Sequence, residues 1–176
     1  RNSIIVEESS IAHSYVPYGR WLPVKTRGKN WFDYENTNNY RIYTDATISK
    51  IDNGIRLQQT GSGMYKFAGY KLNVKPMIGK TFNLSCNYKA NSNNVAGITI
   101  YWLNGGNLDT EYRIAILQGN GGTFTIPEEE KFEQIVILFY SNYNGTGNAN
   151  DYVDYTDIQL ELGDTKTEFE PYKEPT

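Results

Sequence analysis

The chain has 176 residues, of which 39% are hydrophobic and 21% are charged, and its formal net charge is −3 at pH 7. This length suits a single domain with a tail, and the hydrophobic content is too high for a disordered chain. The negative charge argues against a protein that binds the nucleic-acid backbone, and the sequence lacks the run of about 18 apolar residues that a membrane span needs.

Residues 1–27 contain two Pro and several aromatic residues but no series of strands, and they repeat the end of the chain in weak form. A shift of 154 positions places "SIIVEESSIAHSYVPYGRWL" on the closing "DIQLELGDTKTEFEPYKEPT". We interpret residues 1–27 as the end of a preceding module plus a linker, and residues 28–176 as one module with an exit segment. Because the chain starts at Arg1 and not at Met, we expect a fragment of a longer protein. The identical pairs are Ile4 and Ile158, Glu7 and Glu161, Pro17 and Pro171, and Tyr18 and Tyr172.

From residue 28 onward, short runs with a period of two predict β-strands. The clearest is "TFNLSCNYK" (81–89), whose apolar positions Phe82, Leu84, Cys86 and Tyr88 are expected to face a core. The abundance of Tyr, Asn, Gly and Thr also favours strands and turns over helices. The other predicted strands are 54–59, 97–103, 112–117, 124–126, 134–140 and 157–163.

Asn-Gly pairs at positions 53–54, 104–105, 120–121 and 144–145 lie between the apolar runs, as tight hairpin turns require. No segment keeps a helical stripe of apolar residues over three turns. Short strands at this spacing predict an all-β fold, an antiparallel β-sandwich.

The inventory of reactive side chains argues against an enzyme. His13 is the only histidine, so a Ser-His-Asp or Cys-His arrangement has no other base. Cys86 is the only cysteine and sits in an alternating strand pattern, which is typical of a buried small apolar residue. The acidic run "PEEEKFE" (127–133) is interpreted as a solvated loop and not as a catalytic carboxylate pair.

The order of motifs after residue 28 resembles a family. "GKNWFDYENT" resembles the opening of modules in tail and baseplate proteins of phages that infect Gram-positive bacteria. "NGIRLQQTGSGMYKF" and "YKLNVKPMIGKTFNLSCNYKA" look like the middle of jelly-roll carbohydrate-binding modules of the galactose-binding-like type. "YTDIQLELGDTKTEFEPYK" is similar to the closing strand and exit of such modules.

This resemblance implies a jelly-roll, galactose-binding-like sandwich in a phage tail, which acts in the virion at the bacterial cell surface. It also implies a structural calcium near the last strand, where Asp151, Asp154 and Asp157 stand, and we single out Asp157. No other cofactor is expected. The implied partners are cell-wall polysaccharide or another glycan and other tail or baseplate proteins, without nucleic acid or membrane; a homo-oligomer of the full-length protein is left open.

The polar faces of the predicted strands supply the candidate glycan site. If Ile55 and Leu57 point inward, then Arg56 and Gln58 point outward, and the same argument turns Tyr101 outward. It turns Arg113 outward if Tyr112, Ile114 and Ile116 face the core. A rival site is formed by loop tyrosines, and ordinary surface or core remains the alternative for all of these residues. The candidate residues are Arg56, Gln58, Tyr101, Arg113 and Tyr140, and the rival loop residues are Tyr65, Tyr70, Tyr143 and Tyr152.

Three functions stay open at this point. The first is a non-catalytic module that binds bacterial cell-surface polysaccharide by stacking and hydrogen bonding. The second is a structural spacer or protein–protein contact of the tail. The third is an accessory domain of a wall-degrading tail enzyme whose active site lies elsewhere.

Overall fold

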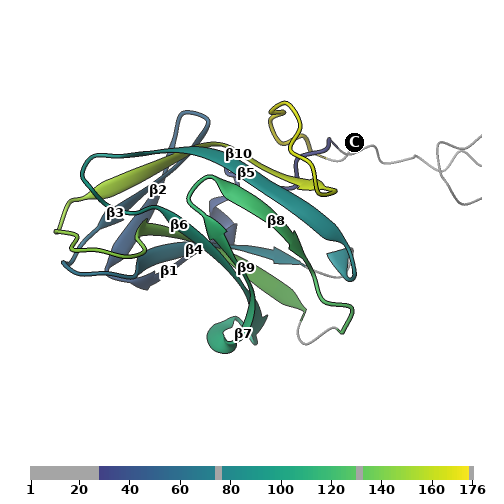
Figure 1. The fold of residues 1–176 in the computed structure, drawn as a ribbon, viewed down its shortest axis with the longest axis horizontal. Coiled ribbons are helices and arrows are strands. Elements are labelled where there is room, and N and C mark those ends of the chain that lie inside the picture. The colour runs from purple at the N-terminus through teal and green to yellow at the C-terminus, as the bar shows by residue number, and fades with distance from the viewer. Residues whose placement is uncertain (1–27, 74–76, 130–132, 175–176) are drawn as a thin grey trace, which may run out of the picture.

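The computed structural model describes residues 28–73, 77–129 and 133–174, and nearly all regular structure in them is β-strand (Figure 1). Residues 1–27, which include His13 and the interpreted end of a preceding module, lie outside the described residues. In the described ranges no helix is long and apolar enough to cross a membrane. The elements are η1 (Thr37–Asn39), β1 (Tyr40–Thr44), β2 (Ala46–Ile51), β3 (Gly54–Gln59), β4 (Lys66–Asn73), β5 (Thr81–Ala90), β6 (Gly97–Asn104), β7 (Asn107–Gln118), β8 (Gly121–Thr125), β9 (Gln134–Asn142) and β10 (Tyr152–Leu162).

The strands form an antiparallel β-sandwich, as predicted. Their hydrogen-bonded order is β1-β4-β9-β6-β7-β8-β5-β10-β3-β2. The ladder is nearly interrupted between β7 and β8, which share only the pair Gln118 and Gly121. We therefore describe two layers: sheet I contains β1, β4, β9, β6 and β7, and sheet II contains β8, β5, β10, β3 and β2.

The core lies between the two sheets, and the period of two identified most of it correctly. Ile55 and Leu57 of β3 are fully buried in it, and so are Ile98 and Ile100 of β6. Cys86 is a buried core residue, and burial raises the pKa of its thiol to about 12, as expected for a packing residue. The sequence analysis did not predict β1, β2 and β4, the strands with the least regular alternation.

Two details of the predicted inward faces differ in the structure. Tyr88 lies on the core-facing side, where its ring contacts buried Tyr155, but it is at the edge of the core and 49% exposed. Ile116 is 50% exposed, because the pairing of β6 with β7 shifts between Ile100 and Tyr101. This irregularity passes over one residue of β7, so the residues after it change faces. Arg113, on the other side of the shift, still lies opposite Tyr101.

The segment before η1 and the segment after β10 meet at one end of the sandwich. Asn30, fully buried, joins them with four hydrogen bonds. Its Nδ2 donates to the carbonyls of Ile158 (2.9 Å) and Glu170 (3.0 Å), and its Oδ1 accepts from the amides of Phe32 (2.9 Å) and Leu160 (3.0 Å). The Asn of the "GKN" motif therefore has a structural task, since it satisfies backbone groups on three segments.

The exit segment (163–173) folds back over the outer face of β10. Glu161 is buried there, and its carboxylate accepts from the amide (2.9 Å) and hydroxyl (2.6 Å) of Thr167. Burial alone would raise the pKa of Glu161, but hydrogen bonds from Thr167 and Gln159 outweigh burial and hold the pKa below its usual value. Lys29 donates to Thr167 and to the carbonyl of Glu168. Both chain connections therefore leave from the same end of the module.

Candidate functional site

The structure places the five predicted glycan-binding residues on two different sheets. Tyr101, Arg113 and Tyr140 belong to β6, β7 and β9 on the outer face of sheet I. Arg56 and Gln58 belong to β3 in sheet II, and they point outward from the other side of the sandwich. The first three are brought together, and the other two are not brought to them.

Arg56 is held in a polar ladder on sheet II. Its Nε and Nη2 donate to the two carboxylate oxygens of Asp154, at 2.6 and 2.8 Å, and its guanidinium lies 3.8 Å from the ring centre of Tyr152. Such a bidentate, stacked arginine has its planar face and two donors occupied. Gln58 beside it donates to Asn150 at 3.4 Å. These contacts tie β3 to β10 and to the loop before β10.

The outer face of sheet I carries a continuous row of aromatic side chains. We call Tyr43, Phe67, Tyr140, Tyr143 and Tyr65 the aromatic row, because each ring contacts the next. The ring centroids are 5.7, 4.9, 4.9 and 5.9 Å apart in that order. The last two contacts are T-shaped, which places the edge of one ring on the face of its neighbour.

The aromatic row lies on a second apolar cluster, separate from the core. Val136 and Leu138 of β9 are fully buried in this cluster. Gly69 of β4 leaves the space that they occupy, since a Cβ there would lie 2.5 Å from Val136 and 2.9 Å from Leu138. Two neighbouring rings are also nearly buried, Tyr101 at 8% exposed and Tyr140 at 5%. Tyr101 and Tyr140 thus form the floor of the surface, whereas Arg113 is exposed.

The aromatic row is buried in the middle, at Tyr140, and most exposed at its loop end, at Tyr65. Tyr143 is half-buried, and Tyr65 at the end of the row is 51% exposed, beside Met64 at 49%. The rings that solvent reaches most easily therefore lie where the loop before β4 meets the loop after β9. The sequence analysis assigned the loop tyrosines and the sheet tyrosines to rival sites, whereas Tyr140 and Tyr143 are in contact and make one surface. The other two loop candidates lie elsewhere, Tyr70 in the core and Tyr152 on sheet II.

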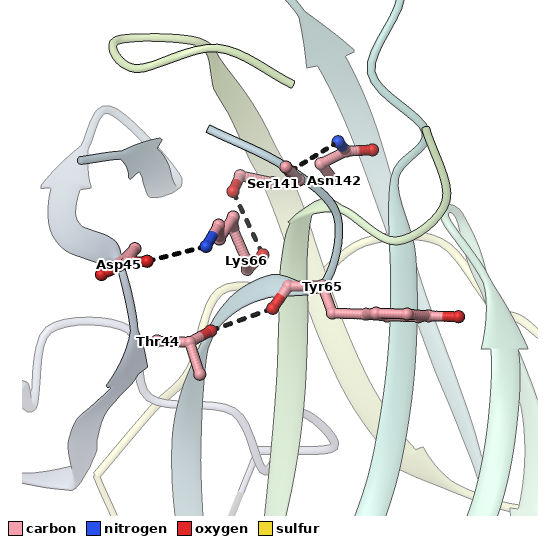
Figure 2. A network of polar contacts seen from close by, with 7 residues as sticks. Thr44, Asp45, Tyr65, Lys66, Ser141 and Asn142 are labelled. Carbon is pink, nitrogen blue, oxygen red and sulfur yellow. Dashed lines mark hydrogen bonds and ion pairs between the residues drawn. The ribbon is translucent and has the colours of Figure 1, made fainter. Parts of the chain in front are cut away.

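A network of polar contacts fixes the backbone of Tyr65 (Figure 2). Tyr65 has φ of 57°, a left-handed conformation that costs a bulky residue free energy. Its amide donates to the carbonyl of Asn142 (2.7 Å), and its carbonyl accepts from the hydroxyl of Thr44 (2.9 Å). The next residue, Lys66, pairs with Asp45 at 2.7 Å. Figure 2 shows the ring of Tyr65 projecting away from the Lys66–Asp45 pair.

The loops on either side of Tyr65 are held by Asn142. Its Nδ2 donates to the carbonyls of Gly63 (3.1 Å) and Gly145 (3.0 Å), so one buried amide joins the loop before β4 to the loop after β9. The position of Tyr65 beside Tyr143 is thus set by the sheet and not by the loops alone.

The aromatic row is electrically neutral. Burial raises the pKa of Tyr140 to about 12, an effect partly offset by its hydrogen bond with Thr99, and burial also raises the pKa of Tyr43. Phenols with such pKa values stay protonated over the physiological range. The surface therefore provides ring faces and hydroxyl groups but no charge of its own.

The predicted calcium position does not have the donors that calcium needs. Asp157 lies in a left-handed bulge of β10, and its carboxylate accepts from the amide of Asn87 at 2.8 Å. Calcium takes about six to eight oxygen ligands, whereas in the described ranges no group of three or more His, Cys, Asp or Glu side chains could hold a metal ion. The residues around Asp157 do not fit the group that the resemblance implied.

The acidic segment after β8 borders an open pocket of about 330 Å³ at the end of the sandwich where the chain connections leave. Glu128 and Glu129 are exposed there, in agreement with a solvated loop, and residues 130–132 lie outside the described residues. The pocket is lined by Trp102, Glu111, Tyr112, Arg113, Pro127, Glu128 and Glu129.

Sequence reasoning missed Tyr43 and Phe67, which complete the aromatic row. The signal for Phe67 was present, because Tyr65, Phe67 and Gly69 alternate along "YKFAG". The signal for Tyr43 was not, since only the antiparallel pairing of β1 with β4 brings it to Phe67.

No protein-family model matches the sequence, and no curated protein matches it significantly. Solved structures are similar in fold. A CBM4 carbohydrate-binding module aligns with a TM-score of 0.47 and 16% identity, over 74% of this chain and 92% of that chain. A structure of accessory secretory proteins 1, 2 and 3 of Streptococcus pneumoniae aligns with a TM-score of 0.45 and 14% identity, over 79% and 99%. The enzymatically active domain of tailspike protein 4 of bacteriophage CBA120 aligns with a TM-score of 0.40 and 15% identity, over 74% and 20%.

Proposed function

We propose that this chain is a non-catalytic carbohydrate-binding module that recognises bacterial cell-surface polysaccharide. The observation that carries the proposal is the aromatic row on sheet I, which ends in the exposed ring of Tyr65 beside Tyr143. Sugar rings present apolar C–H faces that pack on aromatic rings, and their hydroxyl groups bond to neutral polar side chains.

The arrangement suits stacking because the exposed rings are fixed in place. Tyr65 is held by backbone hydrogen bonds to Thr44 and Asn142, and Tyr143 packs against Tyr140. A ligand that stacks on such rings orders few side chains when it binds, which limits the entropic cost of association.

Binding without catalysis agrees with the side chains of the described ranges. The Cys86 thiol is buried with a raised pKa, and it is a poor nucleophile for that reason. Asp154 is engaged by Arg56, and Glu161 is engaged by Thr167. The acids that line the pocket are exposed, Glu111 on β7 and Glu128 and Glu129 on the loop after β8.

We further propose that the module belongs to a phage tail or baseplate protein and acts in the virion at the host cell surface. The support is the resemblance of the "GKNWFD" opening and the "FEPY" exit to modules of such proteins. Because the chain connections leave from one end, neighbouring modules of the same polypeptide would leave the opposite end free to meet the host.

The spacer or protein–protein contact is the second candidate, and one observation favours it. Tyr101 and Tyr140 are more than nine-tenths buried, so most of the outer face of sheet I packs on itself instead of offering open rings. In this case the aromatic row would stiffen a structural module, and its exposed end would touch a tail protein.

Glycan binding by matched variants separates the two candidates. The chain, displayed in several copies because single-site affinity for sugars is low, is applied to host cell-wall polysaccharide and to a broad glycan panel. Tyr65→Ala and Tyr143→Ala should lose about tenfold or more in affinity, the size expected when a stacking ring is removed. Gln58→Ala on sheet II is the control and should bind as the wild type does. No saturable binding by the wild type would reject the carbohydrate-binding proposal in favour of the spacer.

A further inference from the structure

Four loops lie together at the end of the sandwich opposite the chain connections. We call residues 60–65, 91–96, 119–120 and 143–150 the distal loops. The amide of Gly63 donates to the carbonyl of Gly147 (2.9 Å), and the amide of Tyr143 donates to the carbonyl of Val95 (2.8 Å). A Cβ at Gly119 would lie 2.7 Å from the Cβ of Ala96, so the short β7–β8 turn also touches this group. Figure 1 shows these loops on the left and the chain connections on the right.

The distal loops contain no Asp, Glu, Lys, Arg or His, although 21% of the chain is charged. They consist of Asn, Gly, Ser, Thr, Ala, Val, Met and Tyr. Two of the acidic groups that border them are engaged: Asp45 pairs with Lys66, and Asp151 accepts from the backbone amide of Asn148 (2.9 Å). Adaptable amides beside exposed Tyr are typical of recognition loops on rigid β-sandwiches.

The opposite end of the molecule has the reverse character. Most residues of the exit segment "GDTKTEFEPYK" (163–173) and of the loop after β8 are charged or polar. Lys29, Glu168, Glu170 and Lys173 gather there, with Lys173 pairing to Glu170 at 2.8 Å. The module is thus charged at the end that holds Lys29 and the exit segment, and uncharged at the distal loops.

Exposed apolar groups also gather on the uncharged end. Met64, Tyr65 and Val95 are 49%, 51% and 46% exposed. Amides stand beside them, since Asn93, Asn144 and Asn148 are exposed in the same loops. Apolar rings next to amide donors and acceptors, without charge, match a ligand that has C–H faces and hydroxyl groups.

We propose that the distal loops bind an uncharged polysaccharide, and that they discriminate against phosphate- and carboxylate-bearing wall polymers. This inference rests on the proposed carbohydrate-binding function and specifies the class of ligand. Desolvating an anionic group costs free energy unless an opposite charge or several donors compensate it. The distal loops themselves contain no cation for this purpose, and Lys66, which follows Tyr65, is paired with Asp45. A neutral hydroxyl carries no such cost and can bond to Asn amides.

The salt dependence of glycan binding tests this charge selectivity directly. Binding that depends on ion pairs weakens as ionic strength rises, whereas stacking and neutral hydrogen bonds are barely screened. Binding to the uncharged glycan should therefore change by less than about twofold between about 0.02 and about 0.5 M NaCl.

The test compares neutral oligosaccharides with counterparts that carry a uronic acid or a phosphate, printed on one array, at both salt concentrations. We expect the neutral members to bind and the anionic counterparts to bind about tenfold more weakly or not at all. A preference for anionic members, or a loss of binding in salt, would overturn this inference while leaving carbohydrate binding in place. Absence of binding to every glycan would instead reject the proposed function, and this inference with it.

A matched pair of variants locates the effect. Asn144 and Asn104 both precede a glycine with positive φ in an exposed turn, but Asn144 lies in the distal loops and Asn104 in the β6–β7 turn at the other end. Asn144→Asp adds one negative charge to the distal loops and should weaken neutral-glycan binding severalfold. Asn104→Asp adds the same charge to the same dipeptide and should leave binding unchanged. Equal effects of the two variants, or none from Asn144→Asp, would contradict the location.

Discussion

Replacing Asn30 by Ala should destabilise the module more than replacing any other Asn or Gln at the end of the sandwich where the segment before η1 meets the segment after β10. The side chain is fully buried, and its four hydrogen bonds join the segment before η1, β10 and the exit segment. Ala would leave the carbonyls of Ile158 and Glu170 and the amides of Phe32 and Leu160 without this partner. At about 0.5–1.5 kcal/mol for each bond, the free energy of unfolding should fall by about 2–6 kcal/mol.

This loss is a large part of the stability of an ordinary domain, which is about 5–15 kcal/mol. Urea unfolding followed by tryptophan fluorescence gives the free energy, and a thermal melt should show Tm lower by about 5–15 °C. Asn36→Ala is the control, because Asn36 is exposed and makes no side-chain cap hydrogen bond at η1, so it should unfold as the wild type does. If the free energy of unfolding of Asn30→Ala were within about 1 kcal/mol of the wild-type value, the conclusion that Asn30 holds the two end segments together would be refuted.

Three further predictions concern buried residues. Gly69→Ala should lower the free energy of unfolding by about 1–3 kcal/mol in urea titrations, because its Cβ would lie 2.5 Å from Val136. Gln59→Met should raise it by about 1 kcal/mol, because both polar atoms of the Gln59 side chain are buried without a partner and Met fills a similar volume. Burial raises the pKa values of Tyr70 and Tyr140 to about 12 in the folded chain, from an ordinary value of 10.0. The stability that the two phenols contribute is therefore complete below pH 10 and is lost as the pH rises from 10 to about 12, so unfolding midpoints measured across this range should fall.

Each of these expectations has a result that would count against it. Unchanged stability of Gly69→Ala would mean that the apolar cluster on sheet I is loosely packed. A loss of stability in Gln59→Met would mean that the Gln59 amide is hydrogen-bonded in the folded protein, which would contradict this reasoning. A midpoint independent of pH up to about 12 would mean that the two phenols are more accessible to solvent than their burial indicates.

The sequence was a good guide to each strand by itself. Alternation in "TFNLSCNYK" and "GITIYWL" correctly placed Phe82, Leu84, Ile98 and Ile100 in the core. Three Asn-Gly pairs correctly indicated tight turns between strands, whereas the pair at 144–145 lies in the longer loop between β9 and β10. These signals are local, because a strand's own period of two decides which of its residues share a face.

The sequence was a poor guide to which strands share a sheet. Arg56 and Tyr101 were both correctly turned outward from the core, yet β3 and β6 belong to opposite layers, so their outer faces look in opposite directions. Sheet order depends on pairings between residues far apart in the sequence, and periodicity carries no information about them. The same limit hid the aromatic row, since Tyr43 reaches Phe67 only through the pairing of β1 with β4.

Burial on an outer face was also beyond the sequence. Tyr101 and Tyr140 were expected to present their rings to a ligand, but a second apolar cluster surrounds them and leaves them 8% and 5% exposed. A strand whose two faces are both apolar, such as "QIVILFY" in β9, is consistent with this result, because a fully buried strand reads as a continuous apolar run.

The most direct test of the central claim is an NMR titration of the ¹⁵N-labelled chain with the glycan that binds best on the panel. If the chain is a carbohydrate-binding module that uses the exposed end of the aromatic row, the amide signals that shift should cluster at residues 63–67 and 143–147. Shifts that cluster around Arg56 and Gln58 on sheet II, or no saturable shift with any panel glycan, would contradict it.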